Sequence, residues 1–157
     1  MAGADDRQEI VDTINRYATG IDLRDWDLYR SIFADEVEID FESFRGMPPR
    51  KMSGDEWVSL VRSGLPGFHA TQHVLTNFVI DIDGDRATAT AYVTAEHFFD
   101  HGDRMESVSL GGYYTDTLKR DDAGWKIHAC TLHVFWNRGD MGLYDRARER
   151  VSAGLVD

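Results

Sequence analysis

Two histidines four residues apart, His69 and His73, are the first candidates for chemistry, in the segment GFHATQHVLTNFVIDID of residues 67–83. After His73 the segment is β-branched and apolar until an Asp-Gly turn, which predicts a strand. On one strand the two imidazoles face the same way but lie about 13 Å apart at ~3.3 Å per residue, too far for one metal ion. A helical zinc-protease site needs Glu where Ala70 stands. No metal site is expected, and His73 is either a core histidine or a catalytic base.

An acid that can partner His73 lies at the border of the first predicted helix, residues 6–23. On a helical wheel with about 100° per residue, the apolar side chains fill one arc and Asp22 falls on its flank. A carboxylate at the edge of a core needs a partner, and an imidazole is a suitable one. Gly20 is expected to loosen the last turn and let the carboxylate swing inward. The alternative is that Asp22 only ends this helix or caps the next.

Composition excludes several classes of partner. The chain has 157 residues, which predicts a single domain spanning residues 1–157. Its 28 acidic and 17 basic residues give a formal charge of −11, which repels nucleic acid and anionic membranes. The N-terminus, MAGADDRQEI, lacks the pattern of a secretory signal, so a cytoplasmic location is expected. Cys130, the one cysteine, is read as a small buried residue. No nucleotide fingerprint or complete metal triad is present, so no cofactor is expected.

The pattern predicts four helices in all. Asp25 can cap a second helix that contains Trp26 and Phe33 at helical spacing. Ser53 and Glu56 form a capping box for a third, which we expect to end at Gly64. A final helix is expected in MGLYDRARERVSAGL, residues 141–155.

Strands dominate the second half of the chain. An early strand is predicted in EVEIDFESF, residues 36–44, and GMPPRKM, which follows after Arg45, is read as a loop. Long alternating runs follow at residues 72–82, 86–100, 104–119 and 125–137. Their short junctions predict an antiparallel meander, and Gly111-Gly112 predicts a bulge or bend. The expected fold class is α+β, a cone in which N-terminal helices pack on a strongly curved antiparallel sheet and enclose a pocket.

These residues carry a resemblance to a known family. With Tyr17, Asp22 and the segment HATQHVLTN, the chain resembles the SnoaL-like branch of the nuclear-transport-factor-2-like superfamily over nearly its whole length. It is most similar to the group of hexachlorocyclohexane dehydrochlorinase, scytalone dehydratase and bile acid 7α-dehydratase. The resemblance implies elimination chemistry with Asp22 and His73 as a dyad. It also implies active-site roles for Tyr17 and for His97, which lies where the scytalone enzyme has a second histidine.

The predicted function is that of a cofactor-independent lyase acting on a small hydrophobic ring compound. His73, oriented by Asp22, would remove a proton from a carbon next to an activating group, and a leaving group would depart from the neighbouring carbon. Tyr17 would donate a hydrogen bond to the leaving group or to a developing oxyanion. His97, Trp26 and Phe33 are predicted to bind the substrate.

The same residues are compatible with two other functions. An isomerase or polyketide cyclase of the same fold would use Asp22 as its base, with His73 supporting the substrate oxygen. A binding or assembly module would carry no chemistry. The resemblance also implies a homo-oligomer, a trimer first and a dimer second, and aromatic residues on the outer face of the sheet can supply the subunit contacts.

Overall fold

A long amphipathic helix, α1 (Ala4–Asp22), begins the part of the chain that the computed structural model describes, residues 4–156. Its apolar residues Ile10, Ile14, Tyr17 and Ile21 are at most 5% exposed, because their spacing places them on the face that packs on the sheet. The short helix α2 (Trp26–Ser31) follows, and the Asp25 side chain accepts the N–H of Leu28 as predicted for a cap.

Gly20 has a different role from the one predicted. Helix α1 continues through Gly20 to Asp22, so its last turn is not loosened. A Cβ atom at position 20 would lie 2.8 Å from the Cβ of Tyr29. The glycine is therefore required for the close approach of α1 and α2.

The third helix, α3 (Gly54–Arg62), begins at the predicted capping residue. The Ser53 hydroxyl accepts the N–H of Glu56 at 3.1 Å. The predicted end at Gly64 is wrong by one residue. Ser63 is the C-cap, and Gly64 has φ −133° because the chain runs directly into the 3-10 turn η1 (Leu65–Gly67).

The sheet has six strands in the order β2-β1-β6-β5-β4-β3. Their bounds are β1 (Phe33–Phe41), β2 (Met47–Ser53), β3 (Ala70–Asp83), β4 (Arg86–Asp100), β5 (Met105–Asp121) and β6 (Gly124–Arg138). The meander of β3 to β6 is antiparallel, as predicted. Strand β1, however, pairs with β6 in parallel, so the sheet is mixed.

Two segments differ from their predicted structure. The stretch read as a loop forms β2 at the edge of the sheet, where Pro48 and Pro49 are tolerated because an edge strand leaves N–H groups unpaired. Phe33 is the first residue of β1, one residue beyond the C-cap of α2.

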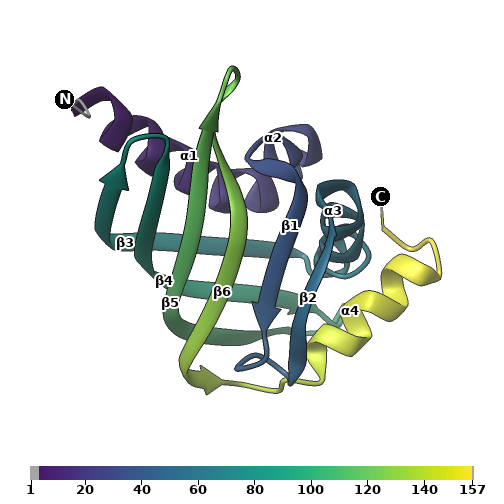
Figure 1. Ribbon diagram of the computed structural model, residues 1–157. Coiled ribbons are helices and arrows are strands. Elements are labelled where there is room, and N and C mark those ends of the chain that lie inside the picture. Colours follow the sequence, from purple (N-terminus) through teal and green to yellow (C-terminus); the bar gives the residue numbers. More distant parts are fainter. Residues whose placement is uncertain (1–3, 157) are drawn as a thin grey trace.

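The sheet bends strongly and the helices cover its concave side (Figure 1). The pairing of β5 with β6 shifts register between Gly111 and Gly112, which confirms the predicted irregularity. The α+β cone is thus confirmed, with most of the core between α1 and the sheet. Helix α4 (Leu143–Ser152) packs on η1, and a second apolar cluster lies beneath it.

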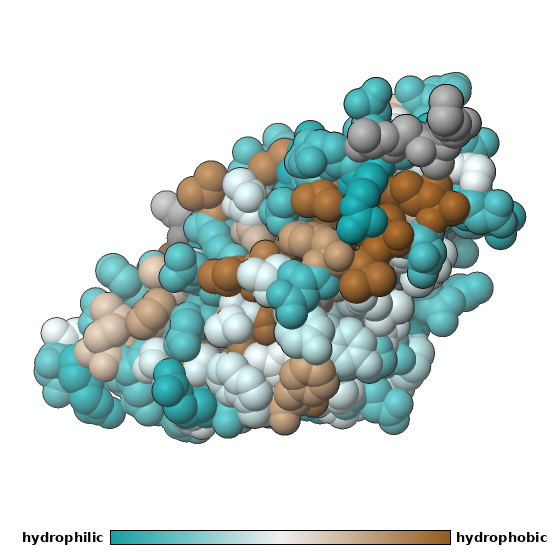
Figure 2. All heavy atoms as spheres, turned by 90° about the vertical axis from the view of Figure 1, so that its left-hand side faces the viewer, coloured by the Kyte–Doolittle hydropathy of each residue, from teal (hydrophilic) through white to brown (hydrophobic). Residues whose placement is uncertain are grey.

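The outer face of the sheet carries exposed apolar residues. Seen from the left-hand side of Figure 1, the surface shows apolar residues gathered among hydrophilic and intermediate ones (Figure 2). Tyr92 is 47% and Phe135 59% exposed, and their rings form a cluster with that of Tyr113, with centroids 5.3 to 6.3 Å apart. The predicted subunit contacts would use these residues. No helix within residues 4–156 is long and apolar enough to span a membrane.

Candidate active site

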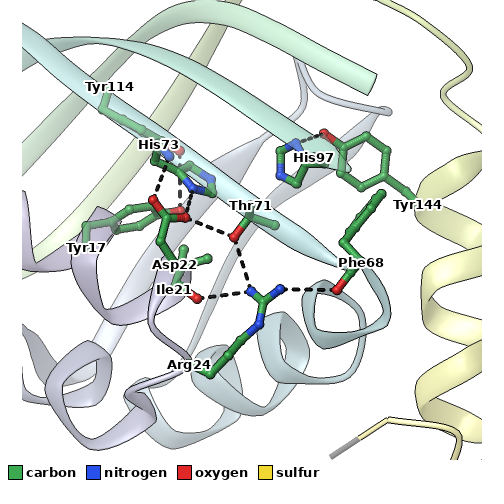
Figure 3. A network of polar contacts seen from close by, with 10 residues as sticks. All are labelled: Tyr17, Ile21, Asp22, Arg24, Phe68, Thr71, His73, His97, Tyr114 and Tyr144. Carbon is green, nitrogen blue, oxygen red and sulfur yellow. Dashed lines mark hydrogen bonds and ion pairs between the residues drawn. The ribbon is translucent and has the colours of Figure 1, made fainter. Parts of the chain in front are cut away.

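Asp22 and His73 are in direct contact (Figure 3). Asp22 is the last residue of α1, and His73 lies near the start of β3, 51 residues later. The His73 Nδ1 atom is 2.7 Å from Asp22 Oδ1, and the backbone N–H of His73 donates to Asp22 Oδ2 at 2.7 Å. The ring and the backbone N–H of His73 thus hold the two oxygens of Asp22, and this fixes the carboxylate relative to the imidazole.

A third donor also holds the carboxylate. The Thr71 hydroxyl donates to Asp22 Oδ1 at 2.9 Å and accepts from the Arg24 guanidinium at 3.2 Å. Arg24 also donates to the backbone oxygens of Ile21 and Phe68. Its backbone has φ +58°, which turns the chain away after α1. Arg24 and Thr71 therefore tie the end of α1 to the start of β3, around the dyad.

The electrostatics keep Asp22 ionised. Burial raises the pKa of the Asp22 carboxyl, but hydrogen bonds from His73 and Thr71 and the attraction of His73 outweigh burial, and the pKa lies below its ordinary value. An ionised carboxylate can only accept, so Nδ1 of His73 is assigned the proton. The Nε2 atom then keeps its lone pair and can accept a proton.

His73 lines a cavity of about 500 Å³ between the helices and the sheet. Two further predicted site residues, Tyr17 and His97, line it too. The side chain of His73 is 6% exposed, so its imidazole is largely shielded from water. The other lining residues are mainly apolar or aromatic and include Ile21, Phe41, Phe44, Met47, Trp57, Leu60, Val61, Leu65, Ala95, Leu110, Tyr114, Leu132 and Tyr144.

His97 is a neutral hydrogen-bonding group. Its residue is 3% exposed, its ring lies 5.3 Å from that of His73, and its Nδ1 is 3.1 Å from the Tyr144 hydroxyl. Burial, aided by the charge of His73, lowers the pKa of His97 to about 3. His97 therefore stays unprotonated at neutral pH and can support a substrate polar group.

Tyr17 remains a hydrogen-bond donor. Its ring is 5% exposed, and its hydroxyl is 3.4 Å from that of Tyr114. Burial, with smaller effects from Tyr114 and other neighbours, raises the pKa of Tyr17 well above its ordinary value. Both tyrosines line the cavity, and their hydroxyls stay protonated at neutral pH.

Two predicted substrate-binding residues, Trp26 and Phe33, do not line this cavity. Phe33 is 2% exposed and packs edge-on against Tyr29 at 5.1 Å, within the core. Trp26 packs against the same ring at 6.3 Å, because α2 turns its aromatic side toward α1. Aromatic residues at helical spacing can pack in a core or line a pocket. Here Phe33 packs in the core and Trp26 packs against it.

Several site residues were not predicted from the sequence. Thr71 could have been found, since residues two apart on a strand share a face and His73 was already a candidate. Tyr144 could not, because its place depends on how α4 docks. His69 is exposed and lies outside the cavity. Within residues 4–156, no three His, Cys, Asp or Glu side chains are grouped as metal ligands.

Comparison with known proteins agrees with this architecture. A protein of Mycobacterium tuberculosis of uncharacterised function is 30% identical over 127 residues, 81% of this chain and 84% of that protein. The crystal structure of the Kfla4162 protein from Kribbella flavida is 34% identical, with a TM-score of 0.85 over 90% of this chain and 98% of the other.

A dehydrochlorinase has the same fold. Hexachlorocyclohexane dehydrochlorinase type 3 of Novosphingobium barchaimii is 22% identical, with a TM-score of 0.72 over 87% of this chain and 90% of the other. At this identity the likeness concerns the fold alone. The SnoaL-like domain family matches residues 2–131. The resemblance predicted from Tyr17, Asp22 and His73 is thereby confirmed, and the chain belongs to the SnoaL-like domain family, with the nuclear-transport-factor-2-like fold.

Proposed function

We propose that this protein is a cofactor-independent lyase that eliminates water, or a comparable leaving group, from a small hydrophobic ring compound. One observation carries the proposal: the contact of His73 with an ionised Asp22 at the wall of a mostly apolar cavity. Nε2 of His73 takes a proton from a carbon next to a carbonyl, and the C–H electron pair forms the enolate. Collapse of the enolate forms the double bond as the C–O bond of the neighbouring carbon breaks. The imidazolium of His73 returns its proton to the departing hydroxide, so water is released and the neutral base is restored.

The remaining groups of the cavity suit the two charges that develop. Asp22 stabilises the imidazolium, and a developing oxyanion needs donors that are already in place. Tyr17 supplies a protonated hydroxyl that accepts from Tyr114, and His97 with Tyr144 supplies a neutral polar pair. Little reorganisation of water is required, because the cavity is lined mainly by apolar side chains.

The geometry favours His73 over Asp22 as the base. Three hydrogen bonds already occupy the two oxygens of Asp22, from Thr71 and from the ring and backbone of His73. Asp22 is also absent from the cavity wall, whereas His73 is part of it. This arrangement supports the lyase over an isomerase or cyclase that uses Asp22 directly. A binding module without chemistry has no need of an oriented imidazole.

A screen in deuterated water tests the proposal. The protein is incubated with mono-, bi- and tricyclic β-hydroxy ketones, and products are followed by mass spectrometry and by the absorbance of conjugated ketones. We expect loss of one water from at least one compound, or deuterium at the carbon next to the carbonyl. Deuterium uptake without loss of water from any compound would favour the isomerase, which abstracts a proton but expels no group. Neither reaction with any compound would reject proton abstraction.

Removing the Thr71 hydroxyl is expected to slow turnover. Thr71→Val deletes a hydrogen bond to the ionised Asp22, and such bonds are worth about 1.5–3 kcal/mol, so kcat falls about tenfold or more while KM changes little. Thr71→Ser keeps the hydroxyl and is expected to retain most of the rate. Steady-state kinetics on a converted substrate measures both. Equal losses in the two variants would show that the hydroxyl has no such role.

We propose that the enzyme acts in the cytoplasm as a homo-oligomer. A trimer is the first expectation and a dimer the second. Support for assembly comes from the exposed rings of Tyr92 and Phe135 on the outer sheet face, which are large apolar groups of the kind found at subunit contacts.

A further inference from the structure

The charge of the cavity lining is opposite to that of the whole chain. The chain carries a formal charge of −11. The lining nevertheless contains three arginines, Arg45, Arg50 and Arg148, and one acid, Asp145. A positive site on an acidic protein attracts anions locally while the rest of the surface repels them.

Arg45 and Asp145 neutralise each other. The guanidinium of Arg45 donates to both oxygens of Asp145, at 2.7 and 2.8 Å, and lies 5.8 Å from the ring centre of Tyr144. The pair joins the turn between β1 and β2 to helix α4. It leaves the positive charge of the lining with Arg50 and Arg148.

Among the described residues, Arg50 and Arg148 have no ion-pair partner. Within residues 4–156, the arginines found in ion pairs are others: Arg30, Arg45, Arg104, Arg120, Arg138 and Arg146. Arg50 lies opposite the fully buried Ile39 in the β1–β2 ladder, hence on the inner side of the sheet. The Arg148 guanidinium lies beside Gly64, just beyond α3. Two separate elements therefore bring free guanidinium groups to one cavity.

The two ends of the cavity differ in how far their side chains are exposed to solvent. His73 and His97, on β3 and β4, are shielded, with the His73 side chain 6% and the His97 residue 3% exposed. Arg50 and Arg148, on β2 and α4, are exposed. Apolar side chains such as Trp57 make up much of the rest of the wall. The inner end can thus hold a reacting ring and the outer end an anion.

We propose that Arg50 and Arg148 bind a carboxylate of the substrate at the cavity mouth, so that the substrate is a ring compound with an acidic side group. The inference deepens the proposed function and rests on it for the identification of the ligand as substrate. Guanidinium groups bind carboxylates through paired N–H donors, and two of them fix the orientation as well as the charge. Because this contact is remote from the reacting carbon, it acts on binding and orientation.

Calorimetric titration with matched probes tests the carboxylate site without any turnover. The probes are phenylacetate, naphthaleneacetate and anthraceneacetate, each paired with its neutral amide. We expect at least one carboxylate to bind about tenfold more tightly than its amide at low salt, and the difference to shrink as salt is added. In Arg50→Gln/Arg148→Gln the preference for the carboxylate is expected to disappear while the amide binds as before.

The control variant is Lys51→Gln/Arg62→Gln. It also removes two positive charges, but neither residue lines the cavity, and Lys51 pairs with Glu38 on the opposite side of β2 from Arg50. This variant is expected to keep the preference. Loss of the preference in the control, equal affinity of amides and carboxylates for the unmodified protein, or no binding by any probe would overturn the proposal.

The outcomes separate this inference from the proposed function. Carboxylate preference in a protein that converts no β-hydroxy ketone, with or without an acidic side group, would leave the anion site standing and reject the lyase. Turnover that depends on His73, together with equal binding of amides and carboxylates, would support the lyase and reject the anion site.

Discussion

Replacement of His73 by alanine is expected to lower kcat on a converted substrate by about 10²–10⁴-fold, the usual contribution of a general base. The substitution removes the atom that accepts the proton and leaves the carboxylate of Asp22 without its imidazole. KM is expected to change much less, because most of the cavity wall is unaltered. Steady-state kinetics with a substrate from the screen, and thermal unfolding to verify the fold, provide the measurement.

The chain offers a matched control for this variant. His69 lies four residues earlier, is exposed and does not line the cavity, so His69→Ala is expected to retain the full rate. Asp22→Asn replaces the carboxylate with a group that cannot stabilise an imidazolium, and it is expected to lose a large part of the rate. Near-normal turnover in both His73→Ala and Asp22→Asn, in folded protein, would eliminate the proposed mechanism.

The second large effect concerns stability and comes from Asp116 on β5. Its side chain is 3% exposed, and within residues 4–156 its Oδ1 has no hydrogen-bond partner. Burial raises the pKa of the Asp116 carboxyl to about 7, and the neighbouring thiol of Cys130 opposes this only in part. In the unfolded chain the carboxyl ionises near its ordinary value of 3.8. The folded state therefore holds a proton that the unfolded state releases.

The sign of the pH dependence follows from linkage. The contribution of Asp116 to stability is fully present below the unfolded pKa and is lost as pH rises toward the folded value of about 7. Between pH 5 and pH 8 the loss is about 3 kcal/mol, at about 1.4 kcal/mol per pKa unit. Asp116→Asn removes the titrating group, so the free energy of unfolding is expected to fall less over this range than in the unmodified protein.

Urea unfolding at the two pH values measures this difference. Asp81→Asn, at an exposed position on β3, is the control and is expected to behave like the unmodified protein. His97, with its depressed pKa, destabilises the fold as pH falls, but it does so in all three proteins and cancels in the comparison. The same pH slope in Asp116→Asn as in the unmodified protein would show that Asp116 is not a proton-binding group of the folded state.

Local signals predicted most of the fold. The caps at Asp25 and Ser53 and the short hairpin junctions each depend on a few adjacent residues, and the structure has all of them. The parallel pairing of β1 with β6 depends on segments about 90 residues apart, and no local pattern records it. Strand β2 was missed because its prolines read as loop residues unless the strand is known to be an edge.

Asp22 and His73 could be predicted as site residues because each lies in a regular helical or strand pattern. The helical wheel placed Asp22 at the core-facing border, the strand pattern placed His73 on a sheet, and the resemblance joined them; the structure has them 2.7 Å apart. Trp26 and Phe33 were assigned wrongly because composition does not distinguish a pocket wall from a core. Arg24 and Arg148 were missed because a left-handed backbone and the docking of a terminal helix are set by tertiary structure.

The position of α4 has an evolutionary consequence. The matched family domain ends at residue 131, whereas Tyr144, Asp145 and Arg148 come from the helix at residues 143–152. Arg148, one of the two arginines proposed to select the substrate, is therefore encoded outside the stretch that carries Asp22, His73 and Arg50. If the proposed function holds, substitutions in the last helix would change the compounds that bind while Asp22 and His73 stay the same.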